Sequence, residues 1–426
     1  MRVLLISANT EQLQMPVLPM GLACVATATQ EAGHEVRLLN LMTRNNTTGL
    51  LENAIADFRP EAIGISVRNI DDQQMGSAAF LLDAARDVVS MCRRFSSAPI
   101  ILGGAGYSIY PESTLSYLGA DMGIQGEGES ALPMLLDRLA RKEKFSDVPN
   151  LFLPGRPWAG KRAILRELDR FRLPVANGFI TFPAEFRKEA IWLPFQTRRG
   201  CPMECSFCST ATIEGRILRR RSVESVMESL IRFAEAGFTN IFFVDNTFNF
   251  PASYAGEICD RIIASGIDIR WRCILYPWKV TEGLIEKMAC AGCVEVSFGF
   301  ESGSEKILRA MNKRFHLEEL RRISALLDKY EITRMGFLML GGPGETRETV
   351  SESLQFADSL DLESGKVTTG IRIYPYTALA DIARREGMVP RDGDLLRPAF
   401  YLEKKMDGWL QETVSEWLST RRNWFS

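Results

Sequence analysis

Short apolar runs alternate with amphipathic stretches along the first 145 residues. The amphipathic stretches have helical spacing and fall near 19–32, 49–58, 74–95, 112–118 and 129–141. The apolar runs are Val3–Ser7, Val36–Asn40, Ala62–Ser66, Ile100–Gly104 and Met122–Gly126. Runs this continuous are typical of parallel strands that helices cover on both faces. The pattern predicts an α/β, doubly wound, flavodoxin-like (Rossmann-type) domain over residues 1–145.

The alternation stops at residue 146 and resumes at residue 191. Prolines and glycines are frequent over 146–190, which we interpret as a linker. Six strands are then expected, each followed by a helical stretch: Trp192–Thr197, Asn240–Asn246, Asp268–Leu275, Val294–Glu301, Met335–Gly341 and Gly370–Tyr374. They predict a (βα)6 partial TIM barrel over 191–387. Residues 388–426 carry Trp409, Trp417 and Trp424 in an amphipathic pattern and are expected to form a small helical C-terminal cap.

Composition narrows the class of protein. The chain of 426 residues is 46% hydrophobic and 24% charged, which excludes a disordered chain. Its 51 basic and 53 acidic residues leave a net charge of −2, so nucleic acid is not an expected partner. No apolar run approaches the ~20 residues of a membrane span, and the first residues resemble a strand rather than a signal peptide. Nine unevenly spread cysteines favour a cytoplasmic protein with a metal or redox site over a secreted disulfide framework.

Three cysteines form the strongest local motif. Cys201, Cys205 and Cys208 have C-x3-C-x2-C spacing, directly after the first strand of the second half. Three thiolates on a [4Fe–4S] cluster leave one iron with an open coordination position, as a catalytic metal requires. The alternatives are a zinc loop that takes a distant fourth ligand, or chance. The only histidines are His34 and His316, which disfavours sites built from several histidines.

With this motif the sequence resembles the radical SAM superfamily. The resemblance implies that Cys201, Cys205 and Cys208 hold the cluster, and that its open iron chelates S-adenosylmethionine (SAM), whose reductive cleavage yields a 5′-deoxyadenosyl radical. The residues it assigns to SAM binding follow the strand ends: Phe207, Asp245, Glu301, Ser302, Gly341, Gly342 and Arg372. A helix N-cap remains an alternative for Asp245, and a simple turn for Gly341–Gly344.

The order of the two halves narrows the resemblance to the cobalamin-binding subgroup. Ligands of a doubly wound sheet bind outside the carboxyl ends of its strands. The expected cobalamin-binding residues are Ser7, Asn9, Met20, Ser66, Arg68, Asn69, Gly103, Gly104, Ala105, Gly126 and Glu127. The chain lacks an Asp-x-His-x-x-Gly motif, so no such histidine supplies a lower cobalt ligand. A degenerate, purely structural domain is the alternative, and Arg68 and Asn69 have an equal alternative in helix capping or pairing with Asp71 or Asp72.

These resemblances imply a cobalamin-dependent enzyme acting on a small molecule. The main hypothesis is methylation of an unactivated carbon or phosphorus, with electrons from an external donor such as flavodoxin or ferredoxin. The alternatives are cobalamin-dependent rearrangement, ring contraction or oxidative cyclisation without methyl transfer, and a non-catalytic iron–sulfur or cobalamin-binding protein. We expect the other cysteines to be structural, although Cys273 could face the barrel lumen and Cys290 with Cys293 could form a second metal site.

Overall fold

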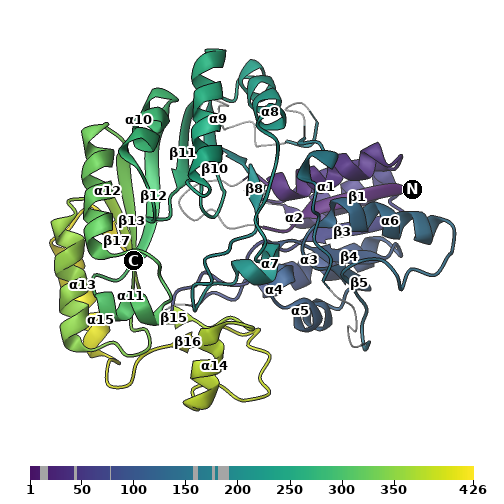
Figure 1. Cartoon of the computed structure of the whole chain (residues 1–426). Helices are drawn as coiled ribbons and strands as arrows, with labels where there is room; N and C mark the ends of the chain where they lie inside the picture. Colours follow the sequence, from purple (N-terminus) through teal and green to yellow (C-terminus); the bar gives the residue numbers. More distant parts are fainter. Residues whose placement is uncertain (10–17, 43–45, 77, 157–161, 175–177, 181–190) are drawn as a thin grey trace. The chain divides into compact units, whose positions relative to one another are not determined.

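The computed structural model describes the whole chain except residues 10–17, 43–45, 77, 157–161, 175–177 and 181–190. The expected linker therefore lies partly outside the described residues. The chain forms two compact units (Figure 1). The first contains Met1–Asp72, Ala79–Leu193 and Thr212–Gly215, and the second contains Gln73–Ala78, Pro194–Ala211 and Arg216–Ser426. Each unit thus includes a short segment from within the other's stretch of sequence.

The first unit is the predicted doubly wound domain. Its sheet has the order β2-β1-β3-β4-β5-β6. The strands are β1 (Arg2–Ser7), β2 (Glu35–Asn40), β3 (Ala62–Ser66), β4 (Ile100–Gly103), β5 (Met122–Ile124) and β6 (Leu151–Phe152). The first five are parallel, whereas β6 pairs antiparallel with β5. The sequence did not indicate β6, because two residues in a proline-rich stretch give no periodic signal.

Helices pack on this sheet because its strands are apolar on both faces. They are α1 (Met20–Glu31), α2 (Thr47–Phe58), α3 (Leu82–Phe95), α4 (Ala105–Ile109), α5 (Pro111–Leu118) and α6 (Gly128–Ala140). In the central strand β1, Val3, Leu4, Leu5 and Ile6 are at most 1% exposed. The helix expected over 74–95 begins only at Leu82, since Gln73–Ala78 belongs to the second unit.

The second unit contains the predicted barrel sheet with one additional strand. Its order is β17-β14-β13-β12-β11-β10-β7. The strands are β7 (Leu193–Phe195), β10 (Asn240–Phe243), β11 (Arg270–Ile274), β12 (Cys293–Glu301), β13 (Thr333–Leu340), β14 (Ser364–Thr369) and β17 (Trp424–Phe425). Their helices are α8 (Val223–Glu235), α9 (Ala252–Ser265), α10 (Glu282–Cys290), α11 (Glu305–Ala310), α12 (Leu317–Lys329), α13 (Arg347–Ser359), α14 (Ala378–Arg385) and α15 (Trp409–Ser419).

The two faces of this second sheet differ. On the outer face, side chains are buried against helices, as where the Phe300 ring packs 5.9 Å from that of Phe356 on α13. Figure 1 shows α10, α12 and α13 along this side of the sheet. On the inner face the alternate residues, such as Met335, Phe337 and Met339 of β13, are half-buried. Strand residues point alternately to the two faces, so this period of two separates a packed face from a more open one.

The sixth barrel strand predicted at Gly370–Tyr374 is wrong. The strand of the sheet is β14, six residues earlier, and β15 (Ile371–Arg372) pairs antiparallel with β16 (Phe400–Tyr401) outside the main sheet. We did not predict β14 because its sequence is polar. A search for apolar runs does not identify a strand that contains a glycine, a lysine and two threonines.

The C-terminal cap is only partly helical. Helix α15 is present, but Trp424 and Phe425 form β17, which runs parallel to β14. Gly365 makes this pairing possible, because a Cβ on Gly365 would lie 2.5 Å from the Trp424 ring. Among the helices of the described residues, none combines the length and apolar character needed to cross a membrane.

Candidate functional site

The three motif cysteines lie on one loop after β7, which we call the cysteine loop (Gly200–Cys208). Short strand β8 (Arg198–Arg199) leads into it, and Gly200 turns the chain with φ of 87°. The side chains of Cys201, Cys205 and Cys208 are all half-buried. The described residues contain no group of three cysteine, histidine or carboxylate side chains already arranged around a metal position.

A four-residue segment after α11, Met311–Arg314, holds the cysteine loop. Three hydrogen bonds join them: Ser206 N donates to Met311 O at 3.0 Å, Asn312 Nδ2 to Glu204 O at 2.8 Å, and Arg314 Nη2 to Pro202 O at 3.0 Å. A fourth contact comes from the start of α14, where Leu379 N donates to Ser206 O at 2.9 Å. The loop backbone is thus fixed from two elements.

Lys313, within this segment, is a buried cation beside the thiols. Its side chain is 5% exposed, its Nζ lies 2.9 Å from Glu301 Oε1, and it lies 5.4 Å from the Phe207 ring centre. Burial alone would lower the pKa of Lys313, but the charges of Glu301 and Cys205 outweigh it and raise that pKa. Burial raises the pKa of the Cys205 thiol, and Lys313 opposes the shift. Sequence reasoning missed Lys313, although a basic pair follows the Glu301 strand at Lys313-Arg314.

Glu301 occupies a strained position at the end of β12. Its φ is 61°, a left-handed conformation that is uncommon for a residue other than glycine. Its side chain folds back over Gly299, where a Cβ would lie 2.4 Å from Glu301 Oε1. Strain of this kind is often found at functional sites, and Lys313 is the partner that holds the carboxylate there.

Asp245, a predicted SAM-binding residue, lies at the entry to the cysteine loop. It is completely buried, and its carboxylate accepts hydrogen bonds from Thr197 N at 2.8 Å, Thr197 Oγ1 at 2.6 Å and Arg198 N at 3.0 Å. Arg198, itself 1% exposed, forms an ion pair with it at 3.4 Å. Burial raises the pKa of Asp245, and Arg198 opposes the shift. Both carboxylate oxygens accept hydrogen bonds from within the chain, so Asp245 secures the entry to the cysteine loop, and its predicted contact with SAM stays a prediction.

Ser302 and Arg372 are also turned inward. The Ser302 hydroxyl lies 2.9 Å from that of Ser353 on α13 and accepts a hydrogen bond from Ser304 N. The Arg372 guanidinium donates to the carbonyl oxygens of Ile373 at 2.7 Å and Leu395 at 3.1 Å. In this structure both side chains stabilise neighbouring segments, and their predicted contacts with SAM stay predictions.

Gly341 and Gly342, at the end of β13, are required by close packing. Gly341 has φ of 95°, and a Cβ there would lie 2.6 Å from Leu402. The N–H groups of both glycines donate to the carboxylate of Glu345. Burial raises the pKa of Glu345 to about 7, although the two N–H groups oppose the shift. Sequence reasoning did not single out Glu345, which fixes this turn.

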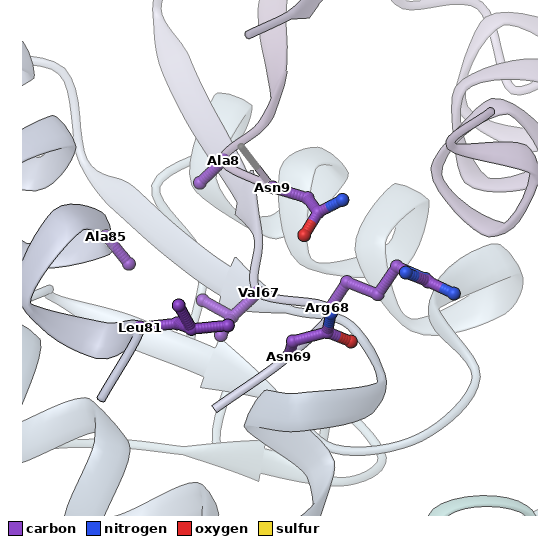
Figure 2. Close-up of a pocket in the computed structure, with 7 residues that line it drawn as sticks. All are labelled: Ala8, Asn9, Val67, Arg68, Asn69, Leu81 and Ala85. Atoms are coloured by element: carbon purple, nitrogen blue, oxygen red, sulfur yellow. The ribbon is translucent and has the colours of Figure 1, made fainter. Parts of the chain in front are cut away.

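A pocket lies at the carboxyl ends of β1 and β3 in the first unit. Ala8, Asn9, Val67, Arg68, Asn69, Leu81 and Ala85 line it, and it encloses about 270 Å³, including space open to solvent (Figure 2). Within the described part of the chain, Arg68 makes no ion pair and no hydrogen bond. Its side chain reaches solvent, yet burial by the surrounding atoms lowers its pKa. The alternative in which Arg68 pairs with Asp71 or Asp72 is therefore not observed.

The glycines near this pocket let two loops approach closely. Gly104 has φ of 101°, and a Cβ there would lie 2.5 Å from Val67 O. A Cβ on Gly106 would lie 2.9 Å from Arg68 O. Ser66 is in register with both Ser7 and Gly103 on the neighbouring strands. The loop after β4 is thus seated on the backbone that carries Arg68.

The remaining predicted cobalamin residues lie around the same sheet edge. Met20 begins α1, Ala105 begins α4, and Gly126 and Glu127 precede α6. Glu127 does not offer a free carboxylate, because its Oε2 accepts a hydrogen bond from Leu165 N at 2.7 Å.

The other cysteines are not part of the site. Cys273 is buried on the outer face of β11, close enough to Cys259 of the helix α9 to raise the pKa of that thiol. The expectation that Cys273 faces the barrel lumen is therefore wrong. Cys290 is exposed whereas Cys293 is buried, so this pair does not share one environment. Burial raises the pKa values of the thiols of Cys92, Cys259 and Cys293, as expected for cysteines that pack as small apolar side chains.

Comparison with known families gives one match to each unit. The model of the radical SAM superfamily matches residues 196–357, and that of the B12 binding domain matches residues 6–136. A protein of Pyrococcus horikoshii named as an uncharacterized methyltransferase is 28% identical over 399 residues, covering 90% of this chain and 83% of the relative. The tryptophan 2-C-methyltransferase of Streptomyces laurentii is 23% identical, covering 87% of this chain and 73% of its own length.

Two solved structures have the same fold. The radical SAM methyltransferase TsrM from Kitasatospora setae, solved with cobalamin and a [4Fe–4S] cluster bound, aligns with a TM-score of 0.81 at 23% identity, over 91% of this chain and 75% of its own. The cobalamin-dependent SAM radical enzyme OxsB aligns with a TM-score of 0.79 at 18% identity, over 98% and 66%. At these identities the likeness confirms the doubly wound domain and the partial barrel.

Proposed function

Since this chain belongs to the cobalamin-binding radical SAM family, we propose that it is a methyltransferase that uses a [4Fe–4S] cluster, SAM and cobalamin. Its proposed reaction is the methylation of an unactivated carbon or phosphorus of a small molecule. When bound, the cluster and SAM supply a 5′-deoxyadenosyl radical, and cobalamin supplies the methyl group. The full-length similarity to methyltransferases supports methyl transfer over the other radical outcomes.

The single observation that carries this proposal is the cysteine loop with Lys313 beside it. We assign Cys201, Cys205 and Cys208 to the cluster, because their three half-buried thiols lie on one firmly held loop. Lys313 and Glu301 supply a charge pair next to them. The ammonium stabilises thiolates and bound anions in a site where water is scarce. Phe207, Gly341 and Gly342 complete the proposed SAM site, through a ring beside Lys313 and through close backbone approach.

We assign the first-unit pocket to cobalamin. Arg68, Asn69 and Asn9 offer polar side chains there, and among the described residues no carboxylate forms an ion pair with Arg68. The other proposed contacts are with the strand-end segments that contain Ser7, Met20, Ser66, Gly103, Gly104, Ala105, Gly126 and Glu127. With no histidine at this pocket, the chain offers no imidazole to cobalt from it.

Two further parts of the proposal concern the surroundings of the enzyme. Reduction of the cluster requires an external electron donor, for which a flavodoxin or ferredoxin is suited. An iron–sulfur cluster held by three cysteines on one partly exposed loop requires a reducing compartment, so we place the protein in the cytoplasm.

The test begins with protein purified without oxygen from cells supplied with cobalamin. We expect about four irons and one cobalt per chain. Reductant and SAM should then yield 5′-deoxyadenosine, and methyl-labelled SAM should yield S-adenosylhomocysteine. Formation of 5′-deoxyadenosine without S-adenosylhomocysteine would exclude methyl transfer, and iron without cobalt after reconstitution would exclude the assignment of the first unit.

A further inference from the structure

Lys366 is an unusual residue for its place in the fold. It lies in the middle of β14, an interior strand of a parallel sheet, between β13 and β17. Strands of parallel sheets are generally apolar, and lysine is depleted in strands. The position of Lys366 therefore needs an explanation beyond local structure.

The packing of β14 shows which way Lys366 points. Its neighbours Gly365 and Val367 are buried on the outer face, and Gly365 is covered by the Trp424 ring. Because residues alternate along a strand, Lys366 and Thr368 point to the inner face, where both are half-buried. Lys366 is therefore on the face that the helices leave open.

The residues beside Lys366 on that face are aromatic. Phe337 of β13 and Phe425 of β17 are its register partners on the two adjacent strands. In-register partners point to the same face of a sheet, about 5 Å apart. Both rings are half-buried. The ammonium group is thus flanked by two flat apolar surfaces, with the Thr368 hydroxyl two residues further along the strand.

Among the residues that the structure describes, no carboxylate pairs with the Lys366 ammonium. Within the described residues Lys366 has no ion pair and no hydrogen bond, unlike Arg272 on the same face, which pairs with Glu295 at 3.6 Å. The inner-face residues of β13, β14 and β17 include no carboxylate: Met335, Phe337, Met339, Ser364, Lys366, Thr368 and Phe425. An unpaired, half-buried lysine is unfavourable unless an anion reaches it.

We propose that Lys366 binds an anionic group of the substrate, and that Phe337 and Phe425 contact a flat apolar body attached to it. The substrate class is a small planar molecule with a carboxylate or phosphate. This inference rests on the proposed function, because it takes the inner face of the barrel sheet as the place where the substrate lies. It makes Lys366 a specificity-determining residue for that reaction.

The test uses three probes of the same shape with cofactor-loaded protein. Phenylacetate and phenyl phosphate carry an anion, whereas phenylacetamide is the neutral match of the first. We expect at least one anion to bind about tenfold more tightly than the amide in calorimetry. That preference should vanish in Lys366→Met and remain in Lys366→Arg. Lys142→Met, which removes a surface lysine of the first unit, is the matched control.

The outcomes separate the inference from the proposed function. Equal binding of the three probes, no binding of either anion, or a preference that survives Lys366→Met would overturn the inference. In each case iron content, cobalt content and 5′-deoxyadenosine formation still report on the proposed function. If Lys366→Met instead weakens the binding of SAM, the ammonium serves the SAM carboxylate and the substrate role is wrong.

A measurement on the unmodified sequence guards against a misfolded variant. Reductive methylation of the wild-type protein with labelled formaldehyde should modify Lys366 more slowly in the presence of the preferred anion than in that of phenylacetamide. Equal rates with the two probes would also overturn the inference.

Discussion

The two sheets of this molecule are both built from parallel strands, but they differ in how their faces are used. In β1 four consecutive residues, Val3–Ile6, are at most 1% exposed, because helices cover both faces. In β13 and β14 every second residue is half-buried, because helices cover one face only. The first sheet can therefore place ligand-binding residues only at strand ends. The second can also use the middle of a strand, as Lys366 shows.

The largest effect that separates the two units should follow loss of a cluster thiol. We expect Cys205→Ala to lose nearly all iron and all 5′-deoxyadenosine formation, while the first unit keeps its cobalamin. Iron and cobalt assays on the same sample measure both. Cys290→Ala, which removes an exposed cysteine of the second unit, should change neither. Full iron content in Cys205→Ala would contradict the assigned ligands.

The next effect compares the strands themselves. Leu5→Ala removes a side chain that is buried in a strand covered on both faces, and should lower the free energy of unfolding by about 2–5 kcal/mol. Met339→Ala, on the inner face of β13, should cost about 1 kcal/mol or less, since its side chain is already partly in water. Urea unfolding of both variants measures the difference. Equal losses would mean that the inner face is as tightly packed as the first sheet.

A third effect is specific to the end of β13 in the second sheet. Burial raises the pKa of Glu345 from its ordinary value of 4.5 to about 7. Between these values the folded protein binds more protons than the unfolded chain, so stability should fall as pH rises from about 4.5 to about 7. The loss of stability is at most about 3.5 kcal/mol, at ~1.4 kcal/mol per unit of pKa shift. Glu345→Gln should reduce this slope in urea unfolding at a series of pH values. A variant with the wild-type slope would show that Glu345 is not its source.

The smallest effect concerns a strand end of the first sheet. Gly104→Ala puts a Cβ against Val67 O at a positive φ, and should cost about 1–3 kcal/mol and weaken cobalamin binding. Gly21→Ala is the matched control, because no atom lies within 4 Å of the added Cβ and the site is helical. Retained cobalamin affinity in Gly104→Ala would argue that the loop after β4 plays no part in binding.

The sequence-based predictions were more accurate for the first sheet than for the second. The five parallel strands of the first sheet were predicted to within two residues, because apolar side chains follow one another along them, whereas the two-residue strand β6 was missed. In the second unit β14 was missed, since half of its residues serve the open inner face and Gly365 makes room for Trp424. A polar strand in a barrel sheet is therefore a signal of function that an apolar-run criterion discards.

The site residues show where sequence spacing stops being informative. The cysteine motif was recognised because the three cysteines lie within eight residues. The contacts that Asp245 and Arg372 make within the chain were not predicted, because a charged residue at a strand end looks the same whether it binds a ligand or a buried backbone group. Lys313 was missed because only the folded chain brings it to Glu301 and Cys205.

The exchange of short segments between the two units has a consequence for how such a gene can be rearranged. Met75 is encoded in the first third of the chain, yet it packs on Gly370, where a Cβ would lie 2.5 Å from its sulfur. Thr212–Gly215 lies within the stretch of sequence that forms the second unit, yet it belongs to the first unit. A recombination event that exchanged the second half alone would bring in a barrel without its own Met75. Each half must therefore be inherited with the short segment that the other half encodes for it.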